Sequence, residues 1–268
     1  GYPQYAETMA ANFDPLNTIF LLLPLREAFT VYMLLPLFLA GMGMWYLERD
    51  LGVRPWISRM MAVGYMLCGL FMTHLQPHFI PGSFAWAPFL ILWLRRHLEA
   101  PSAGRFSMAV LMLAFGFLGG NLQTSTFLVF LVGIYALLWR PGVWLRSLGV
   151  AIAVFVAAFA LSAIMWLPTL ELFWHVSREG LIASSSFTRP YTLLQRLLTL
   201  PLALTFFLPQ LGGSAAGFSP YNLIGAYVID FNMAIGYVPL LLGLWAITTQ
   251  RRDASIRPFA VLTTLAIL

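Results

Sequence analysis

Arg178 and Arg189 are the cations of this sequence best suited to bind a phosphate group. They lie in its longest polar-rich connection between apolar runs, residues 168–230. A guanidinium can hold two phosphate oxygens and stabilise a phosphate leaving group. Alternatively, these arginines pair with Glu171 or Glu179, or with lipid head groups. The residue types alone leave both interpretations open.

Two histidines and one amide form a second group of candidates. His74 and His78 are four residues apart, so they would share one face of a continuous helix and could bind a metal or a pigment. Pro77 and Pro81 interrupt such a helix, which favours a structural or substrate-contacting role, and we assign no metal site. Gln123 follows a paired-glycine turn and could contact substrate or cap that turn.

The arginines predict on which side of a membrane these candidates lie. The chain contains no lysine, and eleven of its fifteen arginines fall in four short connectors between apolar runs. The positive-inside rule makes the side of these connectors cytoplasmic. We therefore expect Arg95, Arg140 and Arg251 to face the cytoplasm, and His78 and Arg178 to face outward. The eleven are Arg49, Arg54, Arg59, Arg95, Arg96, Arg105, Arg140, Arg146, Arg251, Arg252 and Arg257.

Composition places the chain among integral membrane proteins. Hydrophobic residues make up 60% of it and charged residues 9%, far from the fractions of an ordinary soluble domain. The net charge of +5 reflects the arginine bias and requires no nucleic-acid partner. Cys68 is the only cysteine, which excludes an internal disulfide and a multi-cysteine metal site.

Span length and flanking arginines predict an all-α transmembrane bundle with seven full spans and one truncated span. Two further apolar segments, Leu16–Leu25 and Leu197–Leu208, are expected to lie flat at the outer interface. A crossing by the second segment would place the arginines that follow it outside. We read residues 1–268 as one transmembrane domain and as a piece of a longer chain. The predicted spans are 28–47, 57–73, 84–94, 106–118, 122–139, 148–167 and 232–249, with the truncated one from 258 onward.

Short landmarks along most of the chain resemble bacterial YfhO-type membrane proteins, which are similar to GT-C glycosyltransferases. The outer histidines, the turn at Gly119-Gly120-Asn121-Leu122-Gln123 and Ser177-Arg178 follow the order of landmarks in that family. The other landmarks are Gly1-Tyr2-Pro3, Phe13-Asp14-Pro15-Leu16-Asn17, Leu39-Ala40-Gly41-Met42-Gly43-Met44, Arg49-Asp50-Leu51-Gly52, Trp86-Ala87-Pro88 and Leu167-Pro168-Thr169-Leu170-Glu171.

The resemblance implies an inverting sugar transferase that uses a polyprenyl-phosphate-linked donor on the outer face of the bacterial cytoplasmic membrane. Its catalytic acid belongs to the first outer loop, soon after a first helix that this chain lacks. Asp14 and Glu7 are the acids of that loop here, and either would act as general base. Alternatively, Asp14 starts a turn or helix before Pro15.

Two other classes of function stay open at this point. The chain could be a non-catalytic subunit of a larger membrane complex, or a lipid or glycan transporter. We expect membrane lipids and the sugar donor as partners and no nucleic acid. No cofactor is assigned, and a divalent metal remains an alternative. An inverting transfer predicts that Arg178 lies within roughly 10 Å to 15 Å of Asp14 or Glu7.

Overall fold

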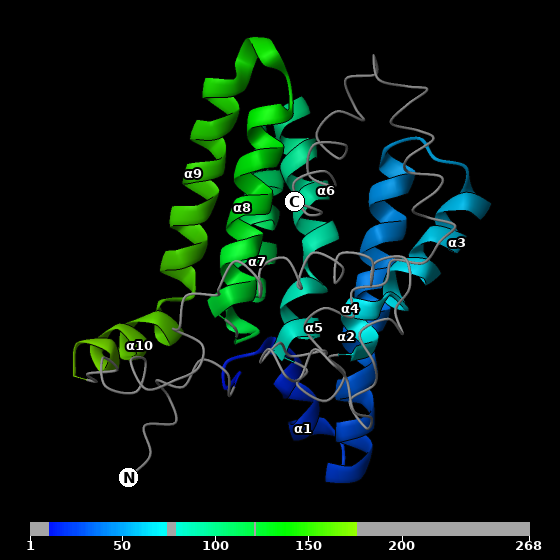
Figure 1. Cartoon of the computed structure of the whole chain (residues 1–268), viewed down its shortest axis with the longest axis vertical. Coiled ribbons are helices and arrows are strands. Elements are labelled where there is room, and N and C mark those ends of the chain that lie inside the picture. The colour runs from blue at the N-terminus through cyan, green and yellow to red at the C-terminus, as the bar shows by residue number, and fades with distance from the viewer. Residues whose placement is uncertain (1–10, 74–78, 121, 176–268) are drawn as a thin grey trace, which may run out of the picture.

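The computed structural model describes residues 11–73, 79–120 and 122–175, and these are helical without any strand (Figure 1). Successive long helices run up and down, so that α2, α6 and α8 point one way and α3, α7 and α9 the other. The helices are η3 (Pro15–Thr18), α1 (Ile19–Leu22), α2 (Leu25–Asp50), α3 (Pro55–Met66), α4 (Gly69–Thr73), α5 (Phe79–Phe84), α6 (Ala87–Glu99), α7 (Ala103–Leu118), α8 (Leu122–Leu138), η4 (Pro141–Val143), α9 (Trp144–Leu161) and α10 (Ala163–His175).

The long helix α2 packs closely because its inward face is built from small residues. Ala28 and Ala40 are fully buried, and Gly43 lies where an added Cβ would be 2.8 Å from the ring of Phe89 on α6. Gly41 similarly faces Met66 of α3 at 3.1 Å. A side chain at either glycine would require a neighbour to move, so the two glycines set the approach of α2 to α6 and α3.

The core lies between α6, α7, α8 and α9. Leu90, Leu113, Leu128 and Val154 contribute one fully buried side chain from each of these helices. In a membrane-embedded bundle such apolar side chains hold the helices together by van der Waals packing, because lipid tails are as apolar as they are. The ends of the helices are thereby held in register, which brings loops that are distant in sequence together.

Two predicted spans are interrupted in the structure. The span predicted over residues 57–73 is divided into α3 and α4 at Leu67 and Cys68, next to Gly69. The span predicted over 148–167 is divided at Ser162, where α10 turns sideways from the end of α9 (Figure 1). The Ser162 hydroxyl donates to the Ala158 carbonyl at 2.8 Å, a side-chain bond that competes with the helix ladder and bends helices.

The third predicted span, residues 84–94, also differs in extent. Its helix α6 covers Ala87–Glu99, and the preceding stretch forms the separate short helix α5. Helix α5 contacts α2, α7 and α8, and Gly82 and Ser83 are buried.

Two of the described helices, α2 and α9, are long and apolar enough to cross a membrane, which gives weak support for an integral membrane protein. A buried helix of a soluble protein can pass the same length test, but only 22% of the most apolar stretch of α9 is buried. Ile152 and Val156 of α9 and Phe130 of α8 are more than half exposed. An outward apolar face of this kind suits a lipid environment. The segments 197–208, 232–249 and 258 onward lie outside the described residues.

Candidate functional site

Asp14 is the one predicted catalytic residue whose side chain the structure describes, and it is almost completely buried, with 3% of its surface exposed. Its Oδ1 accepts a hydrogen bond from the Leu16 backbone N–H at 2.9 Å, so it caps the short helix η3. Its Oδ2 accepts a bond of 3.3 Å from the Tyr32 hydroxyl of α2. The capping role predicted by the alternative interpretation is present, and Tyr32 adds a second bond from a distant helix.

Helix α5 lies against the Asp14 carboxylate. A Cβ added at Gly82 would be 3.1 Å from Oδ2, so any other residue here would require the carboxylate to shift by a few tenths of an ångström. The next residue, Ser83, is buried against the end of α7, where a Cβ added at Gly119 would lie 2.9 Å from the Ser83 backbone nitrogen. Asp14 is therefore enclosed at the end of the bundle where η3, α5 and the C-terminus of α7 meet (Figure 1).

Burial raises the pKa of Asp14 from 3.8 to about 6. Loss of water is the largest effect because it penalises the charged carboxylate, and the bonds from Leu16 and Tyr32 oppose it by favouring the charged form. A carboxyl group with this pKa exchanges a proton close to neutral pH. That property suits a general base, although a helix-capping residue in a buried place would share it.

The other predicted site residues are not brought to Asp14 by any described contact. Glu7, His74, His78, Arg178 and Arg189 lie outside the described residues. The predicted separation of Arg178 from Asp14 or Glu7 therefore stays a prediction. Gln123 belongs to the first turn of α8, whose beginning lies at the same end of the bundle as Asp14 (Figure 1). Within the described ranges, no three His, Cys, Asp or Glu side chains are grouped as a metal would require.

Ion pairs at the opposite end of the bundle join the connectors that we predict to be cytoplasmic. Asp50, at the end of α2, pairs with both Arg95 and Arg96 of α6, and Arg96 approaches Oδ1 at 2.7 Å. Arg105 of α7 donates to the Ala100 carbonyl at 2.7 Å. Arg140, after α8, lies with its guanidinium carbon 5.5 Å from the Trp139 ring centroid. Four of the eleven arginines thus gather at one end, away from Asp14.

Sequence reasoning missed two buried polar residues. Tyr32 is 3% exposed. Together with Ala28, Pro36 and Ala40 it forms a series at intervals of four residues on one face of α2, and all four are buried. This interval in the sequence was the signal that could have predicted a buried Tyr32 hydroxyl. Glu48, near the end of α2, is 4% exposed, and among the residues that the structure describes neither of its carboxylate oxygens has a hydrogen-bond partner. Because Glu48 precedes Arg49 and Asp50, the sequence suggests a group of charged side chains in water at the end of a helix. No local sequence signal therefore predicts that Glu48 is buried.

Comparison of the chain with protein-family models, with curated proteins and with solved structures found no match.

Proposed function

We propose that this protein is an integral membrane enzyme of the bacterial cytoplasmic membrane that transfers a sugar from a polyprenyl-phosphate donor on the outer face. The buried Asp14 carboxyl group, with its pKa near 6 and its place at the end opposite the arginine cluster, is the observation that supports this proposal most. The neighbouring apolar residues Leu21 and Leu22 are 86% and 79% exposed, which would suit contact with the lipid part of the donor.

In the proposed reaction, Asp14 accepts the proton of an acceptor hydroxyl as its oxygen attacks the anomeric carbon. The bond from that carbon to the phosphate oxygen breaks, and the polyprenyl phosphate leaves with the electron pair. Arg178 and Arg189 would stabilise the phosphate, and Glu7 is the alternative base. Because Asp14 is only 3% exposed, some of the residues around it must move before an acceptor can reach it.

The proposed role of Asp14 is tested by sugar transfer in membranes that contain the protein and a radiolabelled polyprenyl-phosphate sugar. Asp14→Asn keeps an oxygen for the Leu16 N–H but cannot accept the proton, so we expect transfer to fall by roughly 100-fold or more. For the wild type, transfer should rise with pH up to about 6 and then level, because the base acts only when it is deprotonated.

Glu27→Gln is the matched control, because Glu27 is an exposed acid in the first turn of α2 at the same end of the bundle. It should leave transfer unchanged. Equal transfer by wild type and Asp14→Asn would remove Asp14 from the reaction, and a loss in both variants would point to a general charge effect.

A non-catalytic subunit of a membrane complex is the second candidate. The observation that favours it is that both Asp14 oxygens already accept hydrogen bonds within the fold, from Leu16 and Tyr32. Under this alternative, Asp14→Asn changes stability without changing any transfer activity. Co-purification of a stable protein partner together with absent transfer by the wild type would support it.

A further inference from the structure

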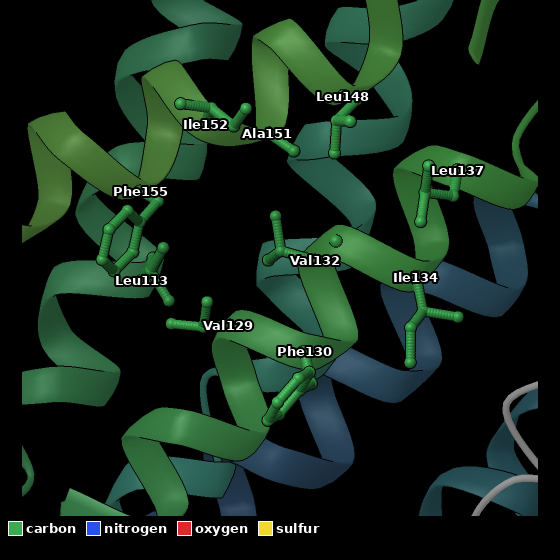
Figure 2. Close-up of a pocket in the computed structure, with 11 residues that line it drawn as sticks. Leu113, Val129, Phe130, Val132, Ile134, Leu137, Leu148, Ala151, Ile152 and Phe155 are labelled. Atoms are coloured by element: carbon green, nitrogen blue, oxygen red, sulfur yellow. The ribbon is translucent and has the colours of Figure 1, made fainter. Parts of the chain in front are cut away.

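We propose that a groove between α8 and α9 binds one acyl chain of an anionic phospholipid, whose phosphate is held by Arg140. The inference rests on the membrane placement in the proposed function and is independent of sugar transfer. Figure 2 shows the two walls of the groove, with Leu148, Ala151 and Ile152 of α9 facing Val132 and Leu137 of α8.

The groove has the shape and lining that a hydrocarbon chain requires. Its volume is about 290 Å³, and every residue that lines it is apolar. A Cβ added at Gly133 would meet no heavy atom within 4 Å, so the missing side chain of this glycine opens the wall on α8. Opposite it, Ile152 is 55% exposed, which places the groove at the surface of the bundle rather than in its core.

The length of the groove matches one leaflet. On α9 it extends from Leu148 to Phe155, seven residues apart, which corresponds to roughly 10 Å of helix. Half of a bilayer core is about 15 Å thick. The groove therefore accommodates the upper part of a single acyl chain from the leaflet at the arginine end, not a chain that crosses both leaflets.

Arg140 supplies the charge at the mouth of the groove. It follows Leu137, the last lining residue of α8, by three residues, and it is exposed. Asp50 pairs with Arg95 and Arg96 at this end, whereas Arg140 makes no ion pair within the described part of the chain. Basic positions between transmembrane helices on the cytoplasmic side bind anionic lipid head groups, so a phosphate suits Arg140 better than a zwitterionic head group.

Trp144 marks the depth of the head group at the same mouth. It precedes Leu148 by four residues on α9, which places both on one helix face, and it is 44% exposed. Tryptophans favour the level of the head groups in a bilayer. Together with Arg140, this side chain locates the phosphate above the apolar part of the groove.

Native mass spectrometry of the purified full chain tests this inference. The chain is titrated with phosphatidylglycerol and with phosphatidylcholine of the same acyl chains. We expect the wild type to retain one phosphatidylglycerol molecule at least about fivefold more tightly than phosphatidylcholine, as one arginine near a lipid head group implies. Equal retention of both lipids, as for loosely surrounding lipid, overturns the assignment of Arg140.

Substitutions that fill the groove should abolish the retention of phosphatidylglycerol. Gly133→Leu places a side chain in the groove without a clash at Cβ, and Ile152→Trp narrows it from the other wall. Gly149→Leu is the matched control, because an added Cβ there also meets nothing within 4 Å but Gly149 does not line the groove. If both glycine variants retain lipid equally at unchanged thermal stability, the groove is not the site.

Two arginine variants test recognition of the lipid head group separately from binding of the acyl chain. Arg140→Gln should remove the preference for phosphatidylglycerol, whereas Arg146→Gln, an exposed arginine on another face of α9, should keep it. Loss of a bound protein instead of a lipid in Gly133→Leu overturns the inference in favour of a partner helix. Release of the wild type from membranes by alkaline carbonate would instead contradict the membrane placement itself.

Discussion

Asp14 combines a structural and a chemical property in one side chain. It caps η3 through Leu16, and it holds a carboxyl group in a place without water. Capping alone would be served equally well by asparagine or serine, which carry no charge into the interior. A buried carboxyl group that lowers stability at neutral pH is a feature that functional sites often retain.

The pH dependence of stability should report this burial. The folded pKa of Asp14, about 6, lies above its ordinary value of 3.8, so the folded protein binds the proton more tightly than the unfolded chain. The free energy of unfolding therefore falls as the pH rises from about 4 to about 6. Asp14→Asn removes this dependence, and its stability relative to the wild type should increase by up to about 3 kcal/mol across that range. Thermal unfolding in detergent at several pH values measures it.

Tyr32→Phe provides a matched variant for the same measurement. The hydrogen bond from Tyr32 lowers the pKa of Asp14, so its removal should shift the fall in stability to higher pH. Parallel pH profiles of wild type and Asp14→Asn would show that folding does not shift the pKa of the Asp14 carboxyl group, which would contradict its burial away from water.

At the scale of elements, close backbone contacts position the short helix α5 beside Asp14. Gly82 faces the Asp14 carboxylate, and Gly119 at the end of α7 faces the backbone of Ser83. Since α5 has only six residues, its own helical hydrogen bonds cannot fix its place. Packing against α2, α7 and α8 does so.

Gly119→Ala should destabilise the protein by about 1 to 3 kcal/mol, because the new methyl group would lie 2.9 Å from the Ser83 nitrogen and 3.1 Å from its Cα. Gly104→Ala is the control. An added Cβ at Gly104 of α7 meets nothing within 4 Å, so alanine should raise stability by about 0.5 kcal/mol through its better helix propensity. Chemical unfolding in mixed micelles measures both, and equal stabilities would contradict the close contact.

The ion pairs of Asp50 should couple α2 to α6. Asp50→Asn leaves two arginines without their carboxylate, and at 14% side-chain exposure we expect a loss of about 2 kcal/mol. Glu99→Gln removes only the pair with Arg95 within α6, at 36% exposure, and should cost under about 0.5 kcal/mol. Thermal unfolding at neutral pH compares the two, and equal losses would show that the pairing between helices contributes nothing beyond a surface pair.

At the scale of the whole molecule, the described part of the bundle has Arg95, Arg96, Arg105 and Arg140 at one end and Asp14 at the other. This polarity gives a topology prediction. In a variant without Cys68, a cysteine at Arg140 should react with an impermeant maleimide only after the membrane is opened. A cysteine at the exposed Thr18 should react in intact cells, because η3 lies at the other end. Labelling of both from one side would refute the orientation.

The sequence by itself determined the helical class, the apolar character and the gathering of arginines at one end. Each of these follows from local properties: hydropathy over a run of residues selects a helix in an apolar environment, and charges at the ends of runs meet when the runs are antiparallel. The beginnings of α2, α7 and α8 lie within three residues of their predicted positions for the same reason.

Only the tertiary structure decided the burial of Asp14, its bond to Tyr32, the bend at Ser162 and the groove beside Gly133. A carboxyl group titrates according to the water and dipoles around it, and here these come from helices that are far apart in sequence. The presence of a groove likewise depends on which residues of the neighbouring helix lie opposite a small residue such as Gly133. Sequence spacing fixes the face of a residue on its own helix, whereas packing decides what lies opposite.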